Sequence, residues 1–174
     1  MNRIHIVGGK NHGKTTVIVD LIEEFTRRGL RVGAIKHTSH VHELDVPGKD
    51  SHRQRSAGAE PVAVVAASGI GVFMARPQDD AVYDRLAPLF TGCDLVLVEG
   101  NLDAQIVKVE VWRSSVGGIC LASARNDIAA VITDDRLDID RPVWPRSNLA
   151  LLAERILSLV DADHSSLCEA QRTK

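Results

Sequence analysis

Runs of apolar residues alternate along this chain with segments in which apolar positions recur at helical spacing. The clearest helical segment is 15–28, where Val17, Leu21 and Phe25 share one face and Gly29 follows as a stop. Predicted strands cover residues 3–7, 31–37, 94–99, 106–113 and 128–135, and further helices cover residues 80–90 and 148–160. This alternation predicts an α/β fold with a mostly parallel sheet.

Two apolar runs interrupt the alternation and lie close together in the sequence. They cover residues 61–67 and 70–76, with only Ser68 and Gly69 between them. Such spacing is typical of a tight antiparallel hairpin, which we expect at an edge of the fold. We predict one domain over residues 1–160, followed by a polar, mobile tail over residues 161–174.

Composition narrows the possible partners. The chain has 174 residues and a formal net charge of −2, so no strong field favours nucleic acid. No apolar run approaches the length of a membrane span, and no basic segment leads into an apolar stretch near Met1. We expect a cytoplasmic protein that binds neither nucleic acid nor membrane.

The first loop carries the strongest motif. Its sequence, Gly-Gly-Lys-Asn-His-Gly-Lys-Thr, matches Gly-x-x-x-x-Gly-Lys-Thr between a predicted strand and a predicted helix. Backbone N–H groups of such a loop converge on phosphate oxygens at the positive end of the helix. The predicted phosphate-binding residues are Gly8, Gly9, Lys10, Asn11, His12, Gly13, Lys14, Thr15 and Thr16. The motif predicts a P-loop NTPase-like three-layer fold, with Lys14 on the β and γ phosphates and the Thr15 hydroxyl on Mg²⁺.

A P-loop protein also needs an acid near the magnesium. Glu99 ends the buried strand at residues 94–99, at the carboxyl end where ligands of open α/β sheets collect. Gly100 follows it and leaves room for a phosphate or a turn. Asp94 lies at the opposite end of that strand, so Glu99 is the better candidate for a metal-binding and catalytic acid.

A loop over residues 36–59 concentrates histidines, acids and bases. His37, His40, His42 and His52 suit a transition metal, as in a metal-delivery GTPase or metallochaperone. The lysines and arginines among them suit an anion instead. A solvated loop is the third interpretation, and the spacing does not choose among them.

Together these segments resemble the molybdopterin-guanine dinucleotide biosynthesis protein B (MobB) family. The resemblance covers residues 3 to about 160 and rests on GGKNHGKTT, AIKHTSHVHELDVPGKDSHRQRSAGA, DLVLVEG, KVEVWR and IAAVITDD. It implies a GTP-binding adapter with weak GTPase activity, which assists a partner nucleotidyltransferase in attaching GMP to molybdopterin. It also implies a homodimer, for which the apolar hairpin offers an interface.

The resemblance assigns roles to individual residues. Residues 8–16 would bind GTP, and Thr15 and Glu99 would lie near Mg²⁺. A role near the γ phosphate, or near molybdopterin or another molybdenum cofactor intermediate, is implied for the middle motif. The middle-motif residues are Asp45, Lys49, Asp50 and Ser51, and Lys36, His37 and Gly100 are further binding candidates. The candidate catalytic residues are Lys14, Glu99 and Asp50. After Gly100 the chain departs from the family pattern, with Asn101 and Leu102 in place of an aromatic residue and a lysine.

Base preference is the least determined property. No Asn-Lys-x-Asp motif occurs, although Asp134 or Asp135 at the end of a late strand could accept hydrogen bonds from guanine. With no evident glutamine to orient water, we expect slow hydrolysis. A P-loop small-molecule kinase, with Asp45 or Asp50 as base, is a further alternative.

Overall fold

A computed structural model describes residues 1–40, 43–77 and 81–172, with side chains to residue 162. Residue contacts divide the chain into two compact units. The first contains residues 1–38 and 89–174, and the second contains residues 39–88. The single domain over residues 1–160 stays a prediction.

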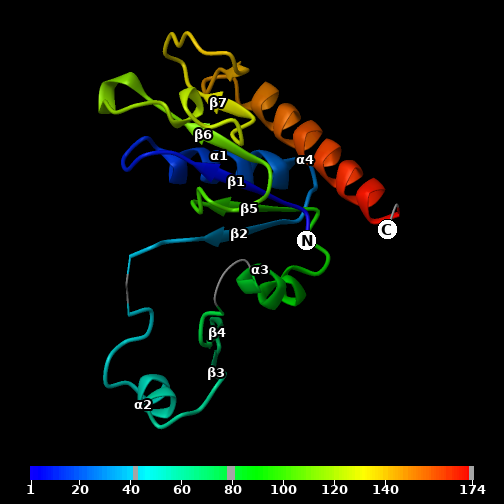
Figure 1. The fold of residues 1–174 in the computed structure, drawn as a ribbon. Helices are drawn as coiled ribbons and strands as arrows, with labels where there is room; N and C mark the ends of the chain where they lie inside the picture. Colours follow the sequence, from blue (N-terminus) through cyan, green and yellow to red (C-terminus); the bar gives the residue numbers. More distant parts are fainter. Residues whose placement is uncertain (41–42, 78–80, 173–174) are drawn as a thin grey trace. The chain divides into compact units, whose positions relative to one another are not determined.

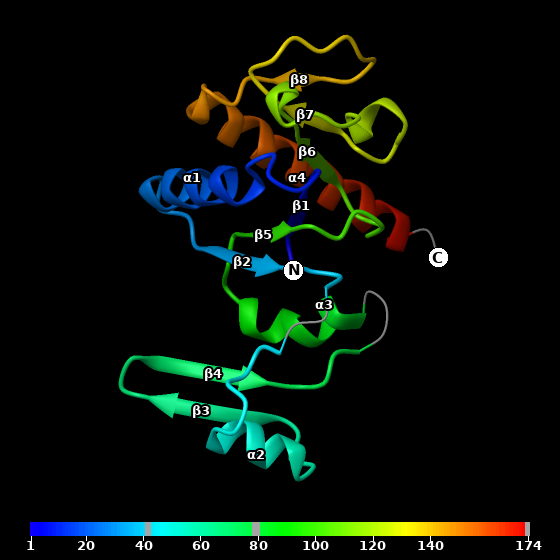
Figure 2. The ribbon, with the colours of Figure 1, turned by 90° about the vertical axis from the view of Figure 1, so that its left-hand side faces the viewer.

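The first unit is built on a six-stranded parallel sheet with strand order β2-β5-β1-β6-β7-β8 (Figure 1; β8 is labelled in Figure 2). The strands are β1 Arg3–Val7, β2 Val32–Lys36, β5 Leu95–Glu99, β6 Lys108–Val111, β7 Ala130–Ile132 and β8 Val143–Trp144. The helices of this unit are α1 Lys14–Arg27 and α4 Leu149–Arg172, with 3-10 turns η2 Ser114–Val116 and η3 Leu121–Ser123. The predicted α/β class with a mostly parallel sheet and an antiparallel hairpin is confirmed.

Two predicted helices have different bounds in the structure. The helix expected over 80–90 is α3, Ala81–Leu86, followed by the 3-10 turn η1, Ala87–Phe90, because Pro88 has no N–H to continue an α-helix. The closing helix continues to Arg172, past residue 160 where the polar tail was expected. Residues 161–172 contain neither glycine nor proline, so nothing local ends the helix there.

The alternation of side chains along each strand divides the sheet into two buried faces. Ile4 and Ile6 of β1 point to the face that α1 and α4 cover, where they pack with Leu21, Phe25 and Ile156. The two helices lie side by side on that face (Figure 2). Burial of this apolar stripe fixes α1, and therefore fixes the loop that precedes it.

The opposite face contains charged groups that are fully buried. On β6, Lys108 pairs with Asp127 at 2.7 Å. Glu110 accepts hydrogen bonds from the backbone N–H groups of Leu121 (2.9 Å) and Ala122 (2.8 Å) and from the Cys120 thiol (3.2 Å). Burial and this carboxylate raise the pKa of Cys120 to about 11.

Both β6 charges are therefore satisfied inside the protein. The alternating pattern of residues 106–113 predicts a half-buried strand, but the structure buries both Lys108 and Glu110. Their partners come from the segment 120–127, which no local pattern connects to the strand.

The second unit contains α2 (Asp50–Ser56), the hairpin strands β3 (Val62–Ala66) and β4 (Gly69–Phe73), and α3. The hairpin is confirmed and forms a two-stranded sheet of its own. Arg55 pairs with Glu43 at 2.6 Å, and its guanidinium lies 5.8 Å from the ring centroid of Phe73. Apolar side chains of the hairpin remain exposed, among them Val65 (76%) and Ile70 (72%).

In the part of the chain that the structure describes, no helix combines the length and the apolar character that crossing a membrane requires.

His5 gives the first unit a measurable pH dependence. Its side chain is fully buried, and Nδ1–H donates to the Gly100 carbonyl oxygen at 3.0 Å. Burial, the main cause, lowers the pKa of His5 from 6.5 to about 4. The unfolded chain therefore binds a proton between these pH values that the folded chain does not, so stability is lost as pH falls through this window.

We predict that the free energy of unfolding falls by up to about 3 kcal/mol through His5 as pH is lowered from 7 to 4. His5→Gln retains an N–H donor but cannot titrate. Its free energy of unfolding should therefore depend less steeply on pH, by a slope that corresponds to at most one proton taken up on unfolding. Urea denaturation of both proteins across this pH range measures the difference, and parallel curves would contradict the prediction.

Candidate functional site: a phosphate-binding loop

The loop between β1 and α1 has a backbone that requires glycine. Gly8 has φ of 136°, and an added Cβ would lie only 2.4 Å from the Val111 carbonyl oxygen. Gly13 caps α1 at φ of 92°, and Asn11 has φ of 67°. These positive φ angles turn the chain sharply between a buried strand and the N-terminus of a helix, where free backbone N–H groups and the helix dipole favour an anion.

Lys14 folds back over the loop. Its Nζ donates to the carbonyl oxygens of Gly8 (3.0 Å) and Gly9 (2.7 Å). Partial burial lowers the pKa of Lys14, while the charge of Glu99 acts in the opposite direction. The ammonium group is therefore held at the concave side of the loop, where the motif requires it.

Glu99 joins three strand ends. Its Oε2 accepts from the Thr15 hydroxyl at 2.9 Å, and its Oε1 accepts from Nζ of Lys36 at 3.0 Å. In the sheet Glu99 pairs with Ile6 of β1 and with Lys36 of β2, so these groups meet because parallel strands end at one edge. A hydroxyl and a carboxylate are hard oxygen donors of the kind that Mg²⁺ prefers.

The residue after Glu99 brings two backbones close together. Gly100 has φ of 90°, and an added Cβ would lie 2.7 Å from the His37 carbonyl oxygen. The His37 N–H donates to the Glu99 carbonyl oxygen at 2.9 Å. His37 and Gly100 therefore lie beside Glu99 at this edge of the sheet.

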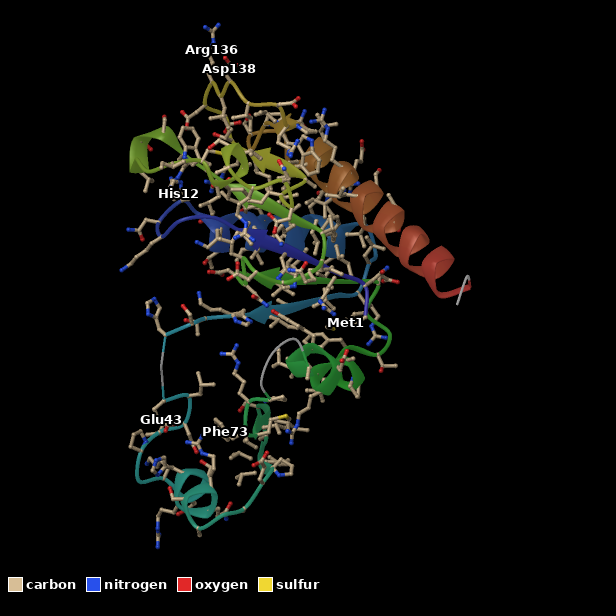
Figure 3. The ribbon with its side chains drawn as sticks, in the orientation of Figure 1. Met1, His12, Glu43, Phe73, Arg136 and Asp138 are labelled. Carbon is tan, nitrogen blue, oxygen red and sulfur yellow. The ribbon has the colours of Figure 1, made fainter. Side chains whose placement is uncertain are left out.

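His12 connects the loop to the residue after β6 and Trp112, a role that its place in the motif does not indicate. It is buried, and Nδ1 accepts from the Arg113 backbone N–H at 2.9 Å. Arg113 also donates through Nη2 to the Asn11 carbonyl oxygen. Burial, chiefly, lowers the pKa of His12, which keeps the ring neutral for this hydrogen bond. Figure 3 shows His12 beside the loop after β1.

Two other predicted phosphate-binding residues of this loop, Lys10 and Thr16, are exposed to solvent.

The two acids proposed to read guanine also hold loops in place. Asp134 Oδ1 accepts from the Ser147 backbone N–H (2.9 Å) and hydroxyl (2.8 Å). Asp135 Oδ2 accepts from the Ser114 N–H at 2.8 Å. In each case the backbone hydrogen bond is the main cause that lowers the pKa of the carboxyl group. One oxygen of each carboxylate is thus committed to the protein.

The predicted residues of the middle motif come together in the second unit. Asp45 is buried and accepts from the Ser51 hydroxyl at 2.9 Å and from the Val46 N–H at 2.8 Å. With Lys49, these residues line a cavity of about 440 Å³ beside the hairpin. Asp50 begins α2 with a side chain that is 94% exposed and lies 3.9 Å from Arg53.

The histidines do not gather into a metal site in the part of the chain that the structure covers. Within residues 1–40, 43–77 and 81–162, no group of three or more histidine, cysteine or acidic side chains is placed to hold a metal ion. His52 accepts from the Gly48 N–H at 3.4 Å and lies 4.0 Å from Glu43. Glu43 is labelled in Figure 3. His42 lies outside the described residues.

The close approach of Gly8 to Val111 gives a stability prediction. Gly8→Ala must displace backbone, whereas Gly29→Ala, also at positive φ (85°), meets no atom within 4 Å. We expect Gly29→Ala to cost about 1 kcal/mol and Gly8→Ala at least about 2 kcal/mol more. Urea denaturation measures both, and equal losses would show that the contact with Val111 does not constrain the loop.

Comparison with known proteins identifies the family of this chain. The family model MobB, molybdopterin guanine dinucleotide synthesis protein B, matches residues 3–134. A Haemophilus influenzae protein named molybdopterin-guanine dinucleotide biosynthesis adapter protein is 33% identical over 153 residues, which cover 87% of this chain and 85% of the relative. The crystal structure of Bacillus subtilis MobB superposes with a TM-score of 0.69 at 26% identity, covering 90% of this chain and 96% of that chain. A MobB homologue from Bacillus stearothermophilus gives 0.65 at 28% identity, covering 93% and 99%.

Proposed function

This chain belongs to the MobB family, and we propose that it acts in molybdopterin-guanine dinucleotide biosynthesis as an adapter that binds GTP together with Mg²⁺. The observation that carries the nucleotide assignment is the joining of Lys14, Thr15 and Glu99 at the end of a glycine-shaped loop. Each group has the chemistry that a nucleoside triphosphate and its metal need at that point.

The loop supplies the phosphate contacts. Backbone N–H groups at the start of α1 face the anion, and the Lys14 ammonium can exchange its carbonyl partners for β and γ phosphate oxygens. The Thr15 hydroxyl and the Glu99 carboxylate would hold Mg²⁺, directly or through water. Bound there, the metal neutralises charge on the phosphates.

Slow hydrolysis accords with this arrangement. Both oxygens of the Glu99 carboxylate are engaged, one by Thr15 and the other by Lys36. A carboxylate held in this way is better suited to a metal than to deprotonating water. We therefore propose weak GTPase activity, and a principal role in assisting a nucleotidyltransferase that attaches GMP to molybdopterin.

Nucleotide binding is tested by calorimetry with GTP, GDP and ATP in the presence of Mg²⁺. We expect preference for guanine nucleotides, and Lys14→Ala should weaken GTP binding at least about tenfold by removing a charge-assisted contact. Thermal unfolding of each variant controls for folding. Equal or tighter ATP binding would contradict the guanine assignment and favour the kinase alternative, and no binding would overturn the proposal.

The metal role of Glu99 has its own test, with a control at the other end of the same strand. Glu99→Gln should reduce the enhancement of GTP binding by Mg²⁺, because an amide is a poorer ligand than a carboxylate. Asp94→Asn makes the same chemical change where the carboxylate accepts from the Arg31 N–H at 2.7 Å, and should leave the enhancement intact. Equal Mg²⁺ dependence in wild type and Glu99→Gln would remove Glu99 from the metal site.

We also propose a homodimer that uses the hairpin. Val65 and Ile70 are cross-strand partners, and both are more than two-thirds exposed. Adjacent exposed apolar residues on a sheet favour association.

The dimer is tested by light scattering after size-exclusion chromatography. Ile70→Lys should convert the dimer to a monomer, because it buries a charge at the interface. Val19→Lys changes an exposed apolar residue (47%) on α1 and serves as the control. A monomeric wild type, or an Ile70→Lys dimer, would contradict this assignment.

A further inference from the structure

Arg146 reaches the phosphate-binding loop from a distant part of the sequence. It lies in the short segment between β8 and α4, and its guanidinium packs against Gly13, the cap of α1. An added Cβ at Gly13 would lie 2.7 Å from Nη1 and 3.3 Å from Nη2 of Arg146. The guanidinium therefore lies directly beside the helix N-terminus where the proposed phosphates bind.

The backbone that carries Arg146 is held in place by Asp134. This carboxylate follows β7 and accepts two hydrogen bonds from Ser147, the residue after Arg146. The Thr133 N–H donates to the Trp144 carbonyl oxygen at 2.9 Å, which aligns the two strand ends. Asp134 thus fixes the turn without forming an ion pair with the arginine within the described residues.

The charges around Gly13 are unbalanced. The start of α1 carries partial positive charge, and the Lys14 ammonium adds a full one. The nearby Glu99 carboxylate is engaged by Thr15 and Lys36. Across the described chain, Arg146 has no carboxylate within ion-pair distance, but its charge contributes to the lowered pKa of Asp134, so Asp134 offsets part of the positive charge. An anion at the loop would relieve the remaining repulsion.

Arg113, the other arginine at the loop, is already committed to it. Its Nη2 donates to the Asn11 carbonyl oxygen, and its backbone N–H donates to His12. Arg113 is therefore a loop anchor. The planar guanidinium of Arg146 lies beside the same loop, and its N–H donors can bind two phosphate oxygens at once.

We infer that Arg146 binds the phosphate chain of the nucleotide and that Asp134 is a positioning residue that keeps it there. This inference rests on the proposed nucleotide site. It assigns Asp134 to the orientation of a phosphate ligand, in place of the hydrogen bonds to guanine considered from the sequence. The segment after β8 thereby becomes part of the site, although it carries no P-loop motif.

The test measures GDP, GTP, pyrophosphate and guanosine binding by competition against a fluorescent GDP analogue. Arg146→Ala should weaken GDP, GTP and pyrophosphate binding about tenfold to a hundredfold, with guanosine unchanged, and Arg146→Lys should restore part of the loss. Arg136→Ala is the matched control, since Arg136 is exposed and points away from the sheet (Figure 3). It should bind all four compounds as the wild type does.

Asp134 is tested by the same titrations. Asp134→Ala should also weaken GDP binding, but less than Arg146→Ala does. The fold-loss of GDP affinity in the double variant should be smaller than the product of the two single fold-losses, because both changes act through one contact. Asp134→Asn keeps an oxygen acceptor for Ser147 and should bind GDP almost as tightly as the wild type.

Three outcomes would overturn the inference. Wild-type affinity of Arg146→Ala for GDP and pyrophosphate would show that the guanidinium does not contact phosphate. An equal loss for guanosine would place it on the base instead. A wild-type protein that binds no nucleotide would overturn the proposed function together with this inference, and that result is distinct from the first two.

Discussion

The contact between the backbone at Gly8 and the Val111 carbonyl oxygen is the constraint on which the site depends. Here the loop after β1 lies so close to the end of β6 that a Cβ at position 8 would clash with the Val111 carbonyl oxygen, so only glycine fits. His12 and Arg113 reinforce the same junction with hydrogen bonds across it. The loop is therefore preorganised by the sheet, so little further ordering is needed when its N–H groups meet an anion.

The parallel arrangement of the strands brings the other residues of the site to this loop. Because β2, β5, β1, β6, β7 and β8 end at one edge, their following residues converge around the start of α1. Lys36 and Glu99 arrive from one side of β1, and Arg113 arrives from β6 on the other. Arg146 completes the set from β8. The cations outnumber Glu99, which is the charge balance expected of a phosphate site.

The sequence predicted the parts of this site that depend on local pattern. Strand, glycine loop and amphipathic helix follow each other directly, and Glu99 ends a buried strand, so β1, α1 and the acid could be found from spacing alone. Arg113 and Arg146 could not, because sheet order brings them to the loop from more than a hundred residues away. Strand β8 is only two residues long, so the sequence there is too short to reveal the alternation of apolar and polar residues that indicates a strand. The burial of Lys108 and Glu110 does not follow from the local pattern, because their partners lie in a separate segment.

Amide chemical-shift perturbation on titration with GDP and Mg²⁺ tests the central claim most directly, since it reports which backbone N–H groups meet the ligand. We expect the largest shifts on residues 8–16, with smaller shifts at Glu99, Gly100 and Arg146. Lys14→Ala, measured in the same way, should need a higher GDP concentration for the same shifts. Shifts centred elsewhere, with residues 8–16 unmoved at saturation, would contradict the claim that this loop is the nucleotide site.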